Sequence, residues 1–327
     1  MGSPEFAVPC LRALHAHHDV ALVVSQPDKP AGRGGQLTAP AVKAAAVELG
    51  LAVIQPRSAR TGELRDALVA SGAELAVVVA YGKILPVAVL EALPRGCINV
   101  HGSLLPRYRG AAPVQWAVIH GEPETGVSIM QLDEGMDTGP VFLERRVAID
   151  PDETAGELLD RMAPIGAQAL LEAIAAIAAG TARAVAQDHG GASHAPMLAK
   201  TDGAIDFARP TAEVAARIRG VDPWPGAHAI LRGQPVKLFR ARPAQGAAAA
   251  PGTVLAVDAA GVHVAAQDGA VVIRELQAAG RKRLAAAQFA AGRGVAVGDV
   301  LGLATARPGP GPEPGPGPGP GPKPGSG

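Results

Sequence analysis

The chain has 327 residues, enough for two domains of ordinary size. Hydrophobic residues make up 48% of it and aromatic residues only 3%, so we expect an aliphatic core. The two cysteines, Cys10 and Cys97, lie far apart without metal-site spacing, which argues against a disulfide scaffold or zinc site and favours a reducing compartment. We find no signal peptide and no apolar run of membrane-spanning length, so we expect a cytoplasmic protein.

Charge is distributed unevenly along the chain, although the formal net charge is zero. Residues 1–206 carry a balance of −7 and residues 207–307 a balance of +7. An asymmetry of this size between halves is typical of a chain whose basic part binds a polyanion. A solvated basic face without a partner explains the charges equally well, so charge alone leaves both interpretations open.

The first half of the chain alternates short apolar strands with helices, which predicts a Rossmann-like α/β domain. We expect strands at 20–25, 51–54, 75–80, 97–101, 126–130 and 141–149. Helices are expected at 9–17, 39–49, 61–71, 86–93, 113–120 and 154–179.

The second half predicts one helix and five short strands, separated by glycine-containing turns. The helix is expected at 211–220 and the strands at 228–231, 235–241, 253–257, 262–266 and 270–277. This pattern fits a small OB-like β-barrel. We therefore divide the chain into an α/β domain at 1–185, a linker at 186–199, a barrel domain at 200–305 and a disordered Gly/Pro tail at 306–327.

The stretch CINVHGSLLPRYRGAAP at 97–113 contains the residue types best suited to chemistry. Alternate side chains of a strand share a face, so Asn99 and His101 point the same way at the end of a strand. An amide donor beside an imidazole suits a reaction in which a carbonyl oxygen gains negative charge while an amine loses a proton. Taken alone, the pair is more simply explained as two satisfied polar residues at a strand end.

A second motif, GVSIM at 126–130 followed by DEGMDTGP at 133–140, lies downstream of the first. Together the two motifs closely resemble those of the folate-dependent formyltransferases. Both are long and occur in the right order, so the resemblance is specific. It covers the chain from Gly2 to about Leu303 and leaves only the tail without a counterpart.

The resemblance implies transfer of a formyl group from 10-formyltetrahydrofolate to the α-amino group of initiator methionyl-tRNA, as in translation initiation. It implies that Asn99, His101 and Asp137 are catalytic and that no metal is needed. Asn99 would donate to the oxyanion, while His101 and Asp137 would relay the proton of the amine. The residues expected to contact the folate are Tyr81, Ile84, Ser103, Leu104, Leu105 and Pro106.

The resemblance also implies that the basic half holds the tRNA by sequence-independent contacts. Phosphate contacts are expected from three residues after the last strand, Arg281, Lys282 and Arg283. The Gly/Pro-rich loop at 26–36 would reach the acceptor end of the tRNA through Arg33 and Lys29. Relatives carry extra lysines beside that arginine, whereas Gly35 and Gln36 follow here, so we expect a weaker grip. We expect a monomer.

The N-terminus departs from the family pattern. GSPEF at 2–6 has the look of a cloning scar, but it continues into Ala-Val-Pro as the family's first turn does. The apolar strand that normally precedes this turn is absent. Because a doubly wound sheet has that strand in its middle, we expect exposed ladder groups and apolar surface there, and a true start further upstream.

Several other interpretations of the same residues remain. Three acids in one loop, Asp133, Glu134 and Asp137, suggest metal binding. Their spacing, however, lacks the dense oxygen ligands of a calcium loop. Cys97 shares a face with Asn99 and His101, but its Ile/Val surroundings favour an inert buried thiol over a nucleophile.

Three alternative functions keep the same motifs. They are a formyltransferase acting on an amino-sugar nucleotide, a hydrolase that deformylates the folate, and a tRNA-binding protein inactivated by N-terminal truncation. The basic second domain and the Arg33 loop disfavour the first two. The intact Asn99, His101 and Asp137 disfavour the third.

Overall fold

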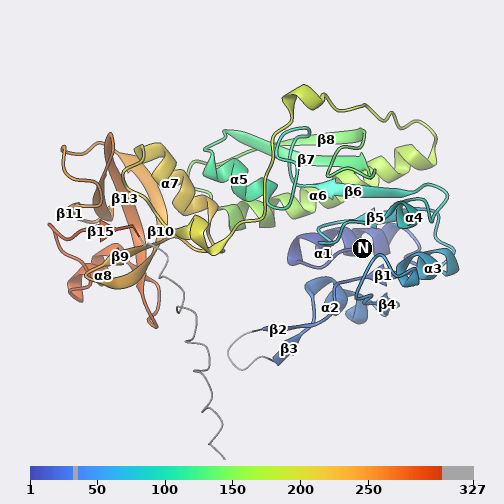
Figure 1. Ribbon diagram of the computed structural model, residues 1–327, viewed down its shortest axis with the longest axis horizontal. Coiled ribbons are helices and arrows are strands. Elements are labelled where there is room, and N and C mark those ends of the chain that lie inside the picture. Colours follow the sequence, from blue (N-terminus) through green and yellow to red (C-terminus); the bar gives the residue numbers. More distant parts are fainter. Residues whose placement is uncertain (32–35, 304–327) are drawn as a thin grey trace, which may run out of the picture.

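The computed structural model describes residues 1–31 and 36–303, which form two domains side by side (Figure 1). Arg33 and the predicted tail at 306–327 lie outside the described residues. An α/β domain comes first in the chain, and a second domain built on an antiparallel sheet follows it. The fold class expected from the strand–helix alternation of the first half is confirmed.

The α/β domain contains a four-stranded sheet in the order β5-β6-β7-β8. Its strands are β5 (Ala76–Val78), β6 (Cys97–His101), β7 (Glu124–Gln131) and β8 (Val141–Ala148). β5 and β6 are parallel, whereas β7 and β8 are antiparallel to their neighbours. A separate parallel pair, β1 (Val23–Val24) with β4 (Val53–Ile54), continues the fold on the far side of β5.

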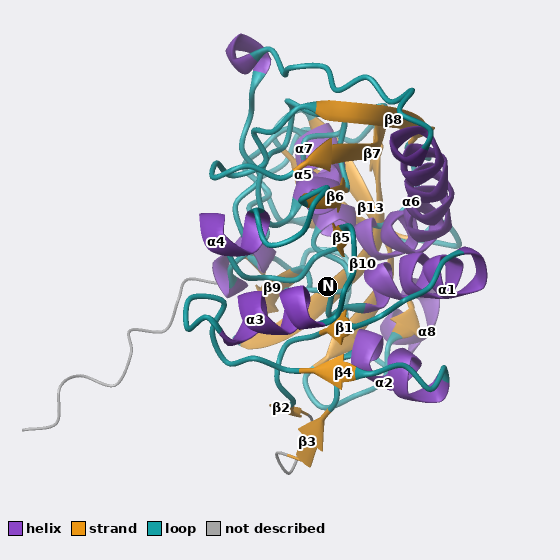
Figure 2. Ribbon diagram, turned by 90° about the vertical axis from the view of Figure 1, so that its right-hand side faces the viewer, coloured by secondary structure: helices purple, strands orange, loops and turns teal. Residues whose placement is uncertain are grey.

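Helices cover both faces of these strands (Figure 2). They are α1 (Val8–His17), α2 (Ala41–Glu48), α3 (Glu63–Ala70), α4 (Val87–Leu90), α5 (Pro113–Ile119) and α6 (Ala155–Ala178). The start of α6 is set by a capping box, in which Thr154 accepts from the Glu157 amide and Glu157 accepts from the Thr154 amide.

The expectation that no segment has membrane-spanning length is wrong for α6. This helix has 24 residues and is long and apolar enough to cross a membrane. Its apolar side chains instead pack under the sheet, where Leu158, Met162 and Leu170 are fully buried in one core with Val127 and Ile129 of β7. The apolar character of α6 is therefore that of a core helix.

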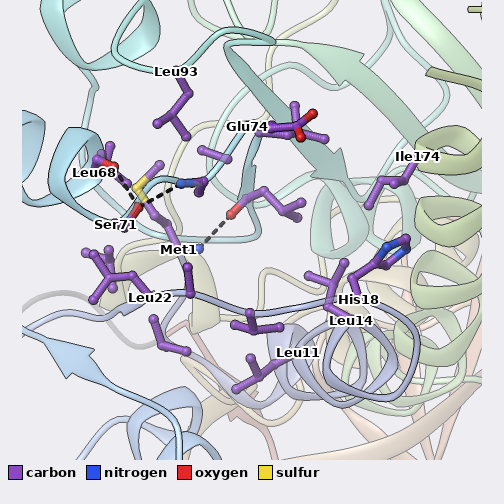
Figure 3. A pocket seen from close by; sticks show the side chains of 18 of the residues that line it. Met1, Leu11, Leu14, His18, Leu22, Leu68, Ser71, Glu74, Leu93 and Ile174 are labelled. Carbon is purple, nitrogen blue, oxygen red and sulfur yellow. Dashed lines mark hydrogen bonds between the residues drawn. The ribbon is translucent and has the colours of Figure 1, made fainter. Parts of the chain in front are cut away.

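Among the described residues, no strand fills the interval between β1 and β5. Met1 and Gly2 enter it and pair with both edges: the Gly2 amide donates to the Val24 carbonyl at 3.0 Å and the Val79 amide to the Met1 carbonyl at 2.9 Å. Beyond them lies a cavity of about 530 Å³ (Figure 3). Apolar side chains of α1, α6, the two strand edges and the turn after α4 line it, among them Leu11, Leu14, Leu22, Leu93 and Ile174.

The second domain packs α7 (Thr211–Gly220) on a curled antiparallel sheet in the order β11-β12-β13-β10-β9-β15. The strands are β9 (His228–Leu231), β10 (Gln234–Ala244), β11 (Val254–Val257), β12 (Val262–Ala266), β13 (Gly269–Ala278) and β15 (Leu301–Gly302). A short β14 (Leu284–Ala285) pairs with β13, and α8 (Ala286–Ala291) follows it. The five expected strands are confirmed, and they form a half-barrel.

The two domains meet where α5 lies against α7 (Figure 1). Ile119 of α5 belongs to the same buried cluster as Ile218 and Val221 of the second domain. Ion pairs join the domains beside this cluster: Arg240 of β10 contacts Glu157 of α6, and Arg242 contacts Asp152. The interface therefore combines an apolar centre with charged edges.

We expect Glu157 to stabilise the folded chain in a pH-dependent way. The Arg240 guanidinium is the main cause that lowers the pKa of Glu157 from 4.5 to about 2. The stabilisation is therefore present above pH 4.5 and is lost as the pH falls toward 2. Because the side chain of Glu157 is half-exposed, Glu157→Gln should lower the free energy of unfolding at pH 7 by about 1 kcal/mol.

Denaturant unfolding at pH 7 and near pH 2.5 measures this difference. Gln at position 157 can keep the capping box, so the change isolates the charge. Glu213→Gln, which removes an exposed i,i+4 pair with Arg209 inside the second domain, is the matched control and should cost less than about 0.5 kcal/mol. An equal loss at both pH values would contradict the assignment.

Candidate active site

Strand β6 places Asn99 and His101 on the same face, as their spacing predicts. Asn99 lies opposite Met130 of β7 and Val78 of β5, and His101 lies opposite Ser128. The imidazole is buried, whereas Asn99 is half-buried. Among residues 1–31 and 36–303, no group forms a hydrogen bond with the Asn99 carboxamide, so its N–H donors remain available to a bound molecule.

The ring of His101 is held between two groups. Its Nε2 lies 2.9 Å from the carbonyl oxygen of Tyr108, and its Nδ1 lies 3.6 Å from Oδ2 of Asp137. A carbonyl oxygen can only accept, so Nε2 must carry the hydrogen. The neutral ring therefore has its lone pair on Nδ1, where it can take a proton beside the Asp137 carboxylate.

Asp137 joins the two sequence motifs. Its Oδ2 accepts a hydrogen bond of 2.8 Å from the Gly110 amide, which belongs to the first motif. The backbone of Asp137 has φ +54°, in the left-handed region that non-glycine residues adopt infrequently. The structure thus brings the three predicted catalytic residues, Asn99, His101 and Asp137, to the C-terminal end of β6.

Ser128 of β7 holds the loop after β6. In the sequence it stands out only as part of the GVSIM motif at 126–130. The Ser128 hydroxyl donates to the Ser103 carbonyl at 2.7 Å and accepts from the Leu105 amide at 3.1 Å. The Ser103 hydroxyl itself donates to the Arg107 carbonyl at 2.6 Å. Ser103 and Leu105 are buried, whereas Leu104 and Pro106 keep exposed surface that a ligand can contact.

The other two residues expected at the folate differ in exposure. The Tyr81 ring is 2% exposed and belongs to a core cluster with Leu64 and Leu85, so its side chain serves the core. The Tyr81 carbonyl accepts a hydrogen bond of 2.9 Å from Nε2 of Gln26. Ile84 is 71% exposed and offers apolar surface.

The segment we predicted to be a linker takes part in the site. Residues 186–196 run back along the loop after β6 instead of only connecting the domains (Figure 1). The Tyr108 amide donates to the Ser193 hydroxyl at 2.9 Å, and the Ala195 amide donates to the Arg109 carbonyl at 2.7 Å. These contacts could not be predicted from the sequence, because the segment shows no periodicity.

The basic residues expected to contact tRNA fall into two groups. Lys29, in the hairpin of β2 (Lys29–Ala31) and β3 (Gln36–Thr38), is exposed, as are Arg281 and Lys282. In the described part of the chain none of these three has an acidic partner. Arg283 instead contacts Glu275 and Asp222, and its guanidinium lies 3.9 Å from the centre of the Phe239 ring.

The hairpin of β2 and β3 is anchored at its base. The Lys43 ammonium lies 2.8 Å from Asp28, and Gln55 donates to the same carboxylate at 2.7 Å. These contacts, that of Gln55 foremost, lower the pKa of Asp28. The anchored base holds the strands that flank Arg33 in one direction, away from the sheet (Figure 1).

Cys97 is 1% exposed, and burial raises the pKa of its thiol to about 11, so it stays protonated at neutral pH. No group of three or more His, Cys, Asp or Glu residues in 1–31 and 36–303 is arranged to hold a metal ion. Asp133 accepts from the Thr138 hydroxyl at 2.7 Å, a contact that shapes its own loop.

The chain is similar to known proteins over most of its length. Residues 2–174 match the family model described as formyl transferase, and residues 197–294 match that of the formyl transferase C-terminal domain. A methionyl-tRNA formyltransferase from Desulfotalea psychrophila is 50% identical over 92% of this chain and 94% of its own. The chain belongs to the methionyl-tRNA formyltransferase family. A relative with the same name from Myxococcus xanthus is 47% identical over 91% of this chain and 95% of its own.

Solved structures of more distant relatives support the fold. An N-formyltransferase from Helicobacter canadensis, in complex with folinic acid and dTDP-3-aminofucose, is similar with a TM-score of 0.64. That likeness covers 86% of this chain and 97% of the other, at 18% sequence identity. At this identity the comparison establishes the shared fold, and it does not identify the acceptor of this chain.

Gly110 is predicted to be intolerant of a side chain. Its φ is +119°, and a Cβ there would lie 2.7 Å from the Ala195 carbonyl oxygen. We expect Gly110→Ala to lower the melting temperature by several degrees and to reduce turnover, because the amide that binds Asp137 must move. Thermal unfolding and steady-state kinetics measure the two effects.

Gly180→Ala is the matched control for Gly110→Ala. Gly180 has φ +69°, and a Cβ there would meet nothing within 4 Å, so this change introduces strain without a clash. It should cost about 1 kcal/mol of stability and leave turnover unchanged. If both variants kept full turnover, the backbone of Gly110 would have no part in the site.

Proposed function

We propose that the chain transfers the formyl group of 10-formyltetrahydrofolate to the α-amino group of initiator methionyl-tRNA, giving N-formylmethionyl-tRNA for translation initiation. Identities of 47% and 50% to two methionyl-tRNA formyltransferases, over nearly the whole chain, support this acceptor. The observation that carries the chemistry is the arrangement of Asn99, His101 and Asp137 around the end of β6.

The residues around β6 fit a folate co-substrate. The unpartnered Asn99 carboxamide offers donors to a formyl oxygen, and the exposed parts of Leu104, Pro106 and Ile84 offer apolar surface to a flat ring. Backbone groups of Ser103, Leu105 and Tyr81 would complete the folate contacts. The folate supplies the formyl group, and no metal is required.

The chain's own residues would stabilise charge and move one proton. Asn99 donates to the oxygen that becomes negative when the amine adds to the formyl carbon. His101 takes the proton of the attacking amine at Nδ1, and Asp137 at 3.6 Å stabilises the imidazolium that forms. His101 then returns this proton to N10 of the folate as the bond between N10 and the formyl carbon breaks, so that tetrahydrofolate leaves and the ring is neutral again. An α-amino group with a pKa near 8 is partly neutral at pH 7, so a weak base is sufficient.

The second domain would hold the tRNA through the phosphates of the tRNA backbone. We propose that this half-barrel is an OB-like domain over residues 200–305, following a catalytic domain at 1–185 and a connection at 186–199. Arg281 and Lys282 are exposed cations suited to phosphates. Lys29 lies in the hairpin of β2 and β3, and we propose that it reaches the acceptor end together with Arg33, which lies between these two strands in the sequence. Arg283, held by Glu275 and Asp222, would position that basic segment. We also propose that the chain is a monomer and acts in the cytoplasm.

The acceptor is tested by a formyl-transfer assay. Purified chain is given 10-formyltetrahydrofolate with charged initiator tRNA, free methionine or an amino-sugar nucleotide. We expect transfer to the tRNA alone, with a KM that rises steeply with salt because phosphate contacts release counterions. Transfer to the sugar nucleotide alone would show that this nucleotide, and not the tRNA, is the acceptor. Release of formate without an acceptor would indicate a hydrolase.

Asn99→Ala should lower kcat by about 10²–10³-fold, the usual cost of one oxyanion donor, while the KM for folate changes little. Asn99 is the only asparagine in the chain, so ¹⁵N-asparagine labelling gives a single side-chain nitrogen signal. This signal should shift when 5-formyltetrahydrofolate is added to the wild-type chain. A kcat within threefold of the wild type would exclude the assigned role.

A further inference from the structure

Gln187 lies in the segment between α6 and α7 and is 9% exposed. Its Nε2 donates two hydrogen bonds, to the Asp137 carbonyl at 2.9 Å and to the Gly139 carbonyl at 2.7 Å. Its Oε1 accepts from Nε and Nη2 of Arg109, at 3.1 and 2.6 Å. One buried side-chain amide thus uses both of its donor hydrogens and its acceptor oxygen.

The contacts of Gln187 reach the backbone on both sides of His101. Arg109 lies between Tyr108, whose carbonyl contacts Nε2 of His101, and Gly110, whose amide binds the Asp137 carboxylate. Arg109 is itself 5% exposed, and its Nη2 lies 3.1 Å from Nδ1 of His189. The Gln187–Arg109 pair therefore ties the loop after β6 to the loop that contains Asp137.

Asp137 needs such support because of its backbone. A non-glycine residue in the left-handed region is strained and persists only where its surroundings hold it. The Gly110 amide holds the Asp137 side chain, whereas Gln187 holds the Asp137 carbonyl. Loss of the second contact would let the peptide rotate and carry the carboxylate away from Nδ1 of His101.

We propose that Gln187 is a positioning residue, which holds Asp137 at its distance from His101 through the paired contacts to the Asp137 and Gly139 carbonyls and to Arg109. The inference rests on the proposed roles of Asp137 and His101. The amide is the chemical group that the position requires. Glutamate cannot donate to two carbonyls, and lysine cannot accept from Arg109.

Gln187→Glu tests this role because it keeps the shape and the acceptor for Arg109 but removes both donors. We expect kcat to fall by about 10- to 100-fold, since a displacement near 1 Å can cost that much. The KM values for folate and tRNA should stay within about threefold, because Gln187 acts through Asp137. Gln267→Glu, at an exposed turn between β12 and β13, makes the same charge change as the matched control.

A double-mutant cycle separates positioning from a structural effect. In an Asp137→Ala background, Gln187→Glu should lower kcat by less than about twofold, since the carboxylate it positions is gone. An equal loss in both backgrounds would overturn the proposal, and so would an unchanged kcat in the wild-type background.

Amide exchange gives a readout that does not need activity. The Gly110 amide, bound to the Asp137 carboxylate, should exchange at least tenfold faster in Gln187→Glu and at the wild-type rate in Gln267→Glu. Unchanged exchange would overturn the proposal even if the wild-type chain failed to transfer formyl groups to tRNA. A failure of transfer with the expected exchange would overturn the proposed function alone.

Discussion

The hydrogen bond from Nε2 of His101 to the Tyr108 carbonyl is the contact on which the rest of the site depends. It selects the tautomer of the ring and turns Nδ1 toward Asp137. Tyr108 can present its carbonyl because its own backbone is unusual, with φ +58°, and because Ser193 accepts from its amide. The Tyr108 hydroxyl is fixed in turn by Glu122, which lies beyond α5. Four separate segments therefore determine the orientation of one ring.

Several basic residues of the second half of the chain form ion pairs, so the net charge of that half overstates the basic surface available to a polyanion. Part of the positive charge of the second domain lies against acids of the first, in the pairs Arg240–Glu157 and Arg242–Asp152. Arg283 is held by two acids of its own domain, Glu275 and Asp222. Cations that hold the domains together are less available to a polyanion. The basic surface proposed to meet tRNA is correspondingly smaller than the count of Lys and Arg in residues 207–307 indicates, and it centres on Arg281 and Lys282.

Local patterns were sufficient for much of the fold and part of the site. The alternation in β6 predicted that Asn99 and His101 share a face, and turn glycines marked β9 to β13. Periodicity located the helix α6 but could not say what it packs against: α6 has the length of a membrane span but lies against β7. Asp137 could be selected only by resemblance. Nothing local separates it from Asp133 and Glu134, and it is its contact with Gly110 that places it beside His101.

The sequence by itself determined the order of the main elements and the family, and it predicted the three residues around β6, because these depend on spacing along the chain and on long motifs. Tertiary structure alone decided which tautomer His101 adopts, what holds the left-handed backbone of Asp137, and that Gln187 lies among these groups. Gln187 is 50 residues from Asp137 and 78 from Arg109. Contacts over such separations form because the folded chain buries polar groups that must find partners, and the identity of those partners is set by proximity in space.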